Sequence, residues 1–295
     1  MTPLEASAAA VLDASPAERL AYMRKPKWFG YAAADGILEQ LESLLVYPET
    51  HRTPGMMLLG DSNSGKSSLA LEFLARHPVD PNPDGDAVRM PVLFVEMPPG
   101  PEQSLLFDAI LTRLGQPFRP RDPLAIKMKQ VRALLTMIGC RMLIIDEFQH
   151  VLGQRQDKRR TLIDTIKHMS NDLRMPIVLL GTSEAHLAVS KDEQLINRLP
   201  ATWMPVWRMD DEYRRLLATY EVTLPLRERS RLQGRDVALL ILELSEGRLG
   251  EIRDVLCLAL QEALRHGLER VDVALLRSLT WTPPSKRRLQ RPPRT

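Results

Sequence analysis

The stretch from Gly60 to Ser67 constrains the fold of this chain more than any other part of the sequence. It reads GDSNSGKS and fits the pattern G-x-x-x-x-G-K-[ST] completely. An apolar run, Met56–Leu59, precedes it, and a stretch with helical apolar periodicity follows. The glycines allow a tight turn whose backbone N–H groups converge on phosphate oxygens at a helix N-terminus. The context predicts a strand, a phosphate-binding loop and a helix, with a purely structural glycine turn as the alternative.

Each position of this loop has an expected role. Lys66 would reach the β- and γ-phosphates of a nucleotide, and the hydroxyl of Ser67 would ligate magnesium. A nucleotide and Mg²⁺ are therefore expected at this loop. The predicted nucleotide-binding residues of the loop are Gly60, Asp61, Ser62, Asn63, Ser64, Gly65, Lys66, Ser67 and Ser68.

Two acids follow a second apolar run. Met142–Ile145 leads directly into Asp146 and Glu147. Because the carboxyl ends of parallel strands meet at one edge of a sheet, these acids are expected beside the phosphate loop. Asp146 would hold magnesium through water, and Glu147 would orient and deprotonate an attacking water. The pair indicates hydrolysis, and a strand that ends in solvated acids is the alternative.

A third apolar run, Ile177–Leu180, ends in Gly-Thr-Ser. The hydroxyl of Thr182 is positioned to hydrogen-bond the γ-phosphate or the attacking water, and Ser183 is the second choice. Gly-Thr-Ser is also a common turn after a strand, so this feature gains weight only beside the other two.

The order of apolar strands and helical segments predicts the domain organisation. Strands alternate with helices between residues 30 and 208, which indicates a parallel sheet with helices on both faces. From Asp210 onward, successive segments carry helical periodicity with no strand between them. We expect an N-terminal helical extension (1–29), an α/β nucleotide-binding domain (30–208), a helical lid (209–281) and a basic tail (282–295) that is disordered by composition.

Composition and charge set broad limits on function. Hydrophobic residues make up 44% and charged residues 26% of the chain, and the net charge is +3. No apolar run approaches the length of about eighteen residues that a membrane span needs, and the N-terminus lacks the pattern of a signal peptide. We therefore expect a cytoplasmic protein. The two cysteines are read as buried free thiols, and the six scattered histidines show no metal-ligand spacing.

In the order of these features the chain resembles the AAA+ ATPases. More specifically it is similar to the TniB-type transposition ATPases, which are related to TnsC and more distantly to IstB and MuB. The resemblance runs from about Lys25 to Gly267. It implies ATPase activity and an AAA+ fold with a five-stranded parallel sheet and a C-terminal helical lid. The segments that carry it are KWFGYAAA, GDSNSGKSSL, LIIDEFQH, LLGTSEA, QLINRL and SEGRLGEIRDVL.

The resemblance implies three further nucleotide contacts. Trp28 and Tyr31 lie in the segment that packs against adenine in this family, although an aromatic core cluster is the alternative. Arg198 matches an arginine finger that reaches the γ-phosphate of a neighbouring subunit, with a surface salt bridge as the alternative. Arg253 matches the lid arginine called sensor 2, with Arg248 as the competing choice.

Contact with the backbone of double-stranded DNA is also implied by the resemblance. Such contacts are largely independent of sequence and strongly dependent on salt. For each basic cluster a solvated helix face is the alternative. The candidate DNA-binding residues are Arg119, Arg121, Lys127, Lys129, Lys158, Arg159 and Arg160.

The resemblance predicts an ATP-dependent regulator of DNA transposition. Such a protein would assemble on target DNA as a ring or helical filament, recruit or activate a partner transposase, and be released or remodelled by ATP hydrolysis. A target-selection accessory protein is a further expected partner. A replication-type AAA+ protein, such as a helicase loader, and a nucleotide-gated signalling scaffold are the alternatives. The sequence shows no acidic cluster of the kind a nuclease or transposase needs.

Overall fold

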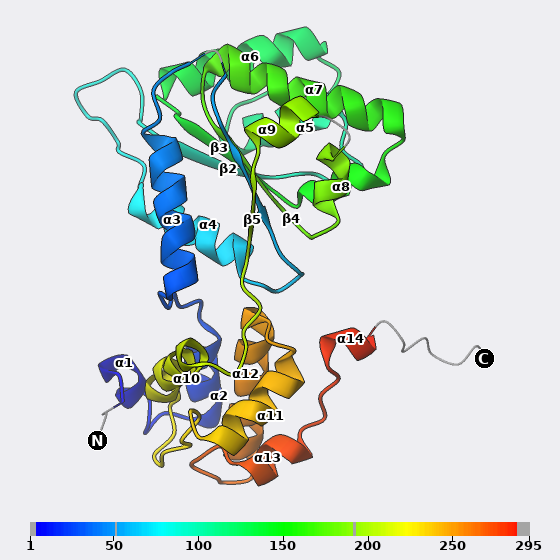
Figure 1. The fold of residues 1–295 in the computed structure, drawn as a ribbon. Helices are drawn as coiled ribbons and strands as arrows, with labels where there is room; N and C mark the ends of the chain where they lie inside the picture. Colours follow the sequence, from blue (N-terminus) through cyan, green and yellow to red (C-terminus); the bar gives the residue numbers. More distant parts are fainter. Residues whose placement is uncertain (1–3, 51, 191–192, 288–295) are drawn as a thin grey trace. The chain divides into compact units, whose positions relative to one another are not determined.

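The chain folds into two units that differ in secondary structure. The computed structural model describes residues 4–50, 52–190 and 193–287. One unit comprises residues 32–204, and the other combines the residues up to 31 with those from 205 onward. The first is an α/β unit and the second is entirely helical (Figure 1).

The α/β unit is built on a five-stranded sheet in the order β2-β3-β4-β1-β5, and every strand pair is parallel. The three central strands are buried along their whole length, which agrees with their continuous apolar sequences. This confirms the predicted parallel sheet. The strands are β1 (Met56–Leu59), β2 (Val92–Glu96), β3 (Met142–Asp146), β4 (Ile177–Gly181) and β5 (Ala201–Trp203).

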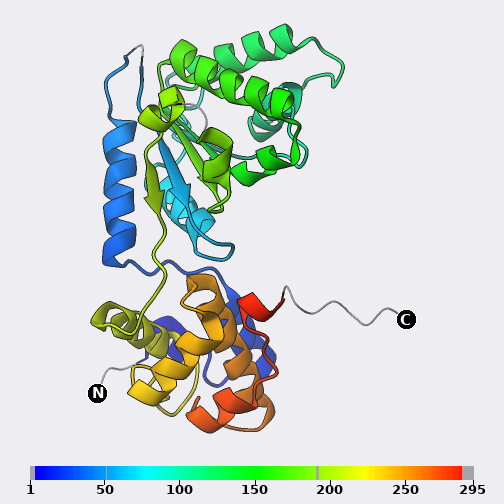
Figure 2. The same cartoon turned by 45° about the vertical axis from the view of Figure 1, so that its right-hand side comes forward.

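Helices cover both faces of this sheet (Figures 1 and 2). One face carries α3 (Ala32–Leu45) and α4 (Lys66–Arg76), which contact each other. The other face carries the helices of the β2–β3, β3–β4 and β4–β5 connections. These connections run along the sheet in the direction opposite to the β1–β2 connection, so right-handed crossovers place their helices on the opposite face from α4. These are α5 (Gln103–Arg113), α6 (Leu124–Met137), the 3-10 helix η1 (Phe148–Gly153), α7 (Gln156–Leu173), α8 (Ala185–Val189) and α9 (Glu193–Arg198).

Amphipathic helices seal the core of the α/β unit. Leu162, Ile166 and Met169 of α7 are buried, as the helical spacing of these residues predicts. They join the side chains of α5, α6 and the sheet in one continuous apolar cluster. Packing on this cluster holds the strand ends, and therefore the loops that follow them, in fixed positions.

The helical unit contains both ends of the described chain. Its helices are α1 (Ala6–Ala9), α2 (Pro16–Arg24), α10 (Asp211–Thr223), α11 (Arg235–Ser245), α12 (Leu249–Arg265), α13 (Val273–Ser278) and α14 (Pro284–Arg287). Ser15 and Glu18 form a capping box at the start of α2. Of the helices described, none is both long and apolar enough to cross a membrane.

The N-terminal helices are part of the helical unit and do not form a body of their own. Helix α2 packs against α12, and α1 packs against α10. The buried guanidinium of Arg19 donates to the backbone carbonyl of Pro225 and forms an ion pair with Glu269 at 2.6 Å. The sequence predicts residues 1–29 as an N-terminal helical extension, and long-range bonds of this kind leave no local trace in it.

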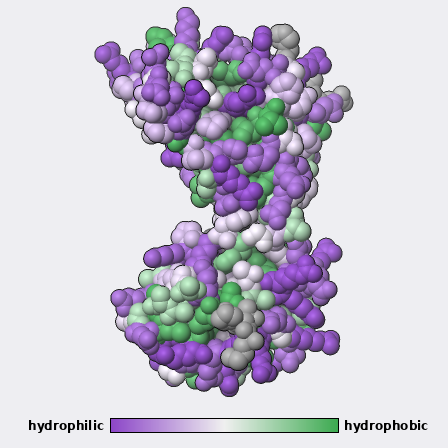
Figure 3. Space-filling model, turned by 90° about the vertical axis from the view of Figure 1, so that its left-hand side faces the viewer, coloured by the Kyte–Doolittle hydropathy of each residue, from purple (hydrophilic) through white to green (hydrophobic). Residues whose placement is uncertain are grey.

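The two units differ in surface character on the face shown in Figure 3. Hydrophilic side chains dominate the α/β unit there, with isolated hydrophobic ones between them. In this view, hydrophobic side chains gather on the part of the helical unit that faces the viewer. Large exposed hydrophobic residues of the α/β unit, such as Val46, Leu71 and Leu187, belong to separate helices or to a helix end, as single exposed apolar residues commonly do.

The start of the predicted basic tail is ordered on the helical unit. Ser285 donates its backbone N–H and its hydroxyl to the carboxylate of Glu246. Arg287 binds the buried carboxylate of Glu251 through two nitrogens, at 2.9 and 2.7 Å, and stacks over Trp281. The tail residues from 288 to 295, for which disorder was predicted, lie outside the described residues.

We expect Arg287→Ala to destabilise the helical unit by about 2 kcal/mol, because the buried carboxylate of Glu251 would lose its two hydrogen bonds to the guanidinium. Urea unfolding monitored by circular dichroism measures this loss. Lys286→Ala removes the same charge from the neighbouring exposed position and is the matched control. Equal unfolding midpoints for the two variants would show that the Arg287–Glu251 pair is not stabilising.

Candidate nucleotide-binding site

The loop between β1 and α4 has the backbone shape that phosphate binding requires. Gly65, the N-cap of α4, has φ +99°, and Asn63 has φ +65°. At Gly60 a Cβ atom would lie 2.7 Å from Ser64 Oγ and 2.9 Å from Met204 Cβ. Glycine is therefore needed at Gly60 for close packing and at Gly65 for its left-handed conformation. A loop of this shape at the N-terminus of a helix is typical of phosphate-binding sites.

Lys66 lies inside this loop. Its side-chain ammonium donates to the carbonyl oxygens of Gly60, at 2.8 Å, and Asp61, at 2.9 Å. Burial lowers the pKa of Lys66, and the nearby carboxylates of Asp146 and Glu147 oppose that shift. The loop thus encloses a cation whose hydrogen-bond acceptors are mainly backbone carbonyls, which suits exchange for the oxygens of a phosphate.

The hydroxyl of Ser67 and the carboxylate of Asp146 meet across the strand ends. Ser67 Oγ donates to Asp146 Oδ2 at 2.5 Å, and the backbone N–H of Glu147 donates to Asp146 Oδ1 at 2.7 Å. Asp146 itself is buried. A hydroxyl and a carboxylate are hard oxygen ligands of the type that Mg²⁺ prefers, so these residues fit the metal expected with a nucleotide.

Glu147 follows β3 in a left-handed conformation, with φ 57° and ψ 32°. Its carboxylate accepts a hydrogen bond from the side-chain amide of Gln149, and His150 Nε2 lies 3.8 Å away. The carbonyl oxygen of the Gln149 amide accepts the backbone N–H of Thr182 at 3.2 Å. Gln149 was not among the predicted site residues. Its only sequence signal is its place in DEFQH, two positions after Glu147.

Thr182 lies at the end of β4, beside the phosphate loop. The backbone N–H of Gly60 donates to the carbonyl oxygen of Gly181 at 3.1 Å, which extends the β1–β4 pairing to the loop. Within the described part of the chain, the buried hydroxyl oxygen Oγ1 of Thr182 has no hydrogen-bond partner. The structure therefore brings Lys66, Ser67, Asp146, Glu147 and Thr182 to one edge of the sheet, as the sequence indicated.

Arg198 lies at the other end of the strands. Its guanidinium donates to Asn171 Oδ1 at 2.9 Å and to the carbonyl oxygen of Thr53 at 3.2 Å. Thr53 precedes β1, whereas the phosphate loop follows β1. Burial is the main cause that lowers the pKa of Arg198, with a further contribution from Arg52. Its position places it away from the Lys66 of the same chain.

Among the candidate DNA-binding residues, Lys127 requires a correction. Its side chain is completely buried, with Nζ 2.6 Å from Asp108 Oδ1 and 2.8 Å from Ser104 Oγ. Every turn of a helix places some residues inward, and Lys127 is such a residue of α6. Because its ammonium is buried against Asp108 and Ser104, it cannot contact a DNA backbone. Lys158 is exposed but paired with Glu102 at 2.6 Å. The other candidates stay predictions: Arg119, Arg121, Lys129 and Arg160 are exposed, and Arg159 is half-buried.

The remaining nucleotide candidates belong to the helical unit. Tyr31 is buried and packs edge-to-face against Trp207, with ring centroids 5.0 Å apart, and Trp28 lies 6.4 Å from Tyr31. Tyr31 and Trp207 therefore belong to the core of the unit, and Trp28 is half-buried beside them. Arg253 lies 3.4 Å from Asp254, and Arg248 lies 3.9 Å from Glu246. The roles of Trp28, Tyr31 and Arg253 toward a nucleotide stay predictions.

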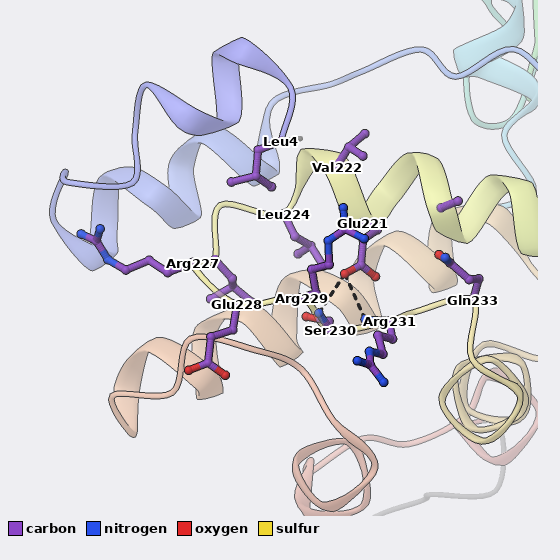
Figure 4. Close-up of a pocket in the computed structure, with 12 residues that line it drawn as sticks. Leu4, Glu221, Val222, Leu224, Arg227, Glu228, Arg229, Ser230, Arg231 and Gln233 are labelled. Carbon is purple, nitrogen blue, oxygen red and sulfur yellow. Dashed lines mark hydrogen bonds between the residues drawn. The ribbon is translucent and has the colours of Figure 1, made fainter. Parts of the chain in front are cut away.

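The helical unit also contains a pocket of about 240 Å³ beside the turn after α10 (Figure 4). The carboxylate of Glu221 accepts the backbone N–H groups of Ser230, Arg231 and Leu232 at 2.8, 3.0 and 2.6 Å. Arg227 pairs with Asp13 at 2.6 Å. The carboxylate of Glu221 therefore stabilises the turn that lines this pocket, which is a structural role and does not indicate a ligand. It is lined by Leu4, Ala218, Glu221, Val222, Leu224, Leu226, Arg227, Glu228, Arg229, Ser230, Arg231 and Gln233.

Comparison with solved structures supports the fold. The ORC2 protein of Aeropyrum pernix, in ADPNP–ADP complexes, has a TM-score of 0.63 and 15% identity over 87% of this chain and 70% of that one. The ORC1 protein of the same organism, in complex with DNA, has a TM-score of 0.60 and 17% identity over 88% and 68%. The RuvB Holliday junction branch migration motor of Thermotoga maritima has a TM-score of 0.52 and 15% identity over 86% and 71%. At these identities the similarity shows a shared fold, that of the AAA+ ATPases.

Comparison at the level of sequence identifies the family. None of the curated proteins matches the chain in sequence. The family described as Bacterial TniB protein matches residues 19–209, which include the phosphate loop, both acids after β3, Thr182 and Arg198. That match spans more than half of the chain. Together with the fold and the assembled phosphate site, it shows that the chain belongs to the TniB family and is an AAA+ ATPase.

Proposed function

We propose that this protein is an ATP-dependent regulator of DNA transposition. The observation that carries the proposal is the TniB family match, which spans the complete phosphate site. A chain with a base candidate, Glu147, beside a sensor hydroxyl, Thr182, is equipped to hydrolyse ATP as well as to bind it. Hydrolysis gives such a regulator a means of leaving DNA after its task.

The residues of the site divide the work of hydrolysis. The loop backbone and Lys66 would hold the phosphates, while Ser67 and Asp146 would hold Mg²⁺. The metal, when bound, neutralises charge on the phosphate oxygens. Glu147 would accept a proton from the attacking water, and the hydroxyl of Thr182 would orient that water or the γ-phosphate.

Arg198 supports a role for assembly. It lies at the opposite end of β1 from Lys66, so its guanidinium would meet the phosphates of a neighbouring subunit. A homo-oligomer, as a ring or a helical filament, then completes each site in trans. Assembly on duplex DNA would use exposed basic residues such as Arg119, Arg121 and Lys129 to contact phosphates. The assembled form would recruit or activate a partner transposase, with a target-selection accessory protein as a further partner.

A replication-type role, such as helicase loading, is the second candidate. The observation that favours it is the similarity in fold to the ORC1 and ORC2 proteins. Affinity purification from the native host separates the two, because it would recover a transposase in one case and a replicative helicase in the other.

Glu147→Gln is expected to bind ATP normally and to hydrolyse it at least about 100-fold more slowly, since the amide cannot accept a proton. The variant should also remain on duplex DNA longer with ATP than the wild type does. Single-turnover hydrolysis and filter binding measure the two effects. Glu72→Gln, on the surface of α4, is the control. Normal turnover in Glu147→Gln would remove this residue as the base.

We expect ATP to promote binding of random duplex DNA at low salt. Replacing Arg119 and Arg121 together by alanine should weaken that binding about tenfold or more and reduce its salt dependence, because two phosphate contacts are lost. Filter binding at two salt concentrations measures this change. Lys127→Met is unsuitable for testing DNA binding, because it removes the ion-pair partner of the carboxylate of Asp108 and would destabilise the fold. If the wild type shows no ATP-dependent binding at low salt, the DNA role is wrong.

Mixing two inactive variants tests the arginine finger. Arg198→Ala keeps an intact phosphate loop but lacks the finger, whereas Lys66→Ala lacks nucleotide binding but keeps the finger. We expect mixtures to regain part of the wild-type ATPase rate, because a Lys66→Ala subunit can supply Arg198 to its neighbour. Steady-state ATPase assays over a range of ratios measure this recovery. A rate that never rises above that of the separate variants would contradict action in trans.

A further inference from the structure

Gln149 connects the candidate base to the end of the neighbouring strand. We propose that Gln149 is a positioning residue for hydrolysis, whose side-chain amide holds the carboxylate of Glu147 in a fixed relation to Thr182. This inference rests on the proposed role of Glu147 as the base. It adds a residue that neither the phosphate-loop pattern nor the acid pair identified.

The amide of Gln149 makes two different hydrogen bonds at the same time. Its nitrogen Nε2 donates to Glu147 Oε2, and its oxygen Oε1 accepts the backbone N–H of Thr182 at 3.2 Å. A backbone N–H can only donate, so the amide oxygen must face Thr182 and the nitrogen must face the carboxylate. Gln149 therefore uses a donor and an acceptor held side by side in one planar group.

The surroundings fix Gln149 in this position. Its neighbours in η1, Phe148 and Val151, are fully buried and anchor the 3-10 helix in the core of the α/β unit. A Cβ atom on Gly181 would lie 3.1 Å from Gln149 Oε1 and 2.6 Å from the Cβ of Ala185. The glycine at the end of β4 therefore leaves the room that the amide oxygen and η1 occupy.

The backbone conformation of Glu147 makes the hydrogen bond between Gln149 and the Glu147 carboxylate possible. The left-handed conformation of Glu147 is uncommon for a residue other than glycine, and its N–H is bound to the Asp146 carboxylate at 2.7 Å. This turn places Gln149 within reach of the side chain of Glu147. A strained backbone next to a reactive group is a frequent feature of functional sites.

Thr182 divides its two polar groups between the protein and the site. Its backbone N–H is bound to Gln149, while its buried hydroxyl oxygen has no partner among the described residues. The hydroxyl of Thr182 is therefore available to a ligand. The backbone N–H of the same residue is linked to Glu147 through the side-chain amide of Gln149. A general base acts only when its carboxylate lies within hydrogen-bond reach of the water. Gln149 restricts the rotation of the Glu147 side chain to such a position.

Two substitutions test this role through steady-state kinetics. Gln149→Met keeps the length of the side chain but removes donor and acceptor, and Gln149→Glu keeps an acceptor but removes the donor to Glu147. We expect kcat to fall about 10- to 100-fold in both, with KM for ATP within about threefold of the wild type, because binding is retained and only positioning is lost. Gln154→Met, just after the same 3-10 helix, is the matched control and should leave both constants unchanged.

A second measurement does not depend on turnover. Hydrogen exchange of the peptide that contains Thr182, without nucleotide, should be faster in Gln149→Met, because its N–H loses an acceptor. Wild-type exchange in Gln149→Met would overturn the bridge, and an unchanged or increased kcat in that variant would overturn its positioning role. Normal turnover in Glu147→Gln would instead contradict the proposed base, while the exchange result would still test the bridge.

Discussion

The parallel pairing of β1 with β4 is the interaction on which the nucleotide site depends. These strands are far apart in sequence, and their register places Leu59 opposite Gly181. The bond from Gly60 N–H to the Gly181 carbonyl then continues the pairing into the phosphate loop. Because β3 lies on the other side of β4, the acids that end β3 arrive at the same edge. A sheet in sequence order would separate the loop from Thr182 and from Asp146.

The same edge concentrates buried charge, which a protein core tolerates only when each charge has partners. Lys66 is neutralised in part by Asp146 and Glu147, and it donates to loop carbonyls. Asp146 accepts both the Ser67 hydroxyl and the Glu147 N–H. These mutual contacts hold the side chains of the site against one another. Lys66 would also contact the phosphates, and Ser67 and Asp146 would also ligate the metal. Nucleotide binding would therefore replace their present hydrogen bonds with bonds to the ligand.

The helical unit is held by a different set of contacts. Arg19 joins the N-terminal helices to Glu269 and Pro225, and Arg287 joins the last described helix to Glu251. Arginine suits both positions because its planar group makes several directed bonds at once. Trp28 and Tyr31 lie in this unit with Trp207, so the aromatic segment before the sheet serves its core whatever its role toward a nucleotide. The sequence predicts these helices from their amphipathic pattern, but it does not predict that Arg19 pairs with Glu269 or Arg287 with Glu251.

The features that could be predicted from the amino-acid sequence are local in origin. The glycine spacing of the phosphate loop, the acids after Ile145 and the alternation of apolar strands with helices each follow from short-range backbone and side-chain preferences. They were enough to predict the parallel sheet and the meeting of Lys66, Asp146, Glu147 and Thr182. Three other features became visible in the folded structure alone. Lys127 faces Asp108 in the core, Arg198 lies away from its own phosphate loop, and Gln149 bridges Glu147 to Thr182. Each of these depends on contacts between residues whose encounter is set by strand order and helix packing, which no short stretch of sequence encodes.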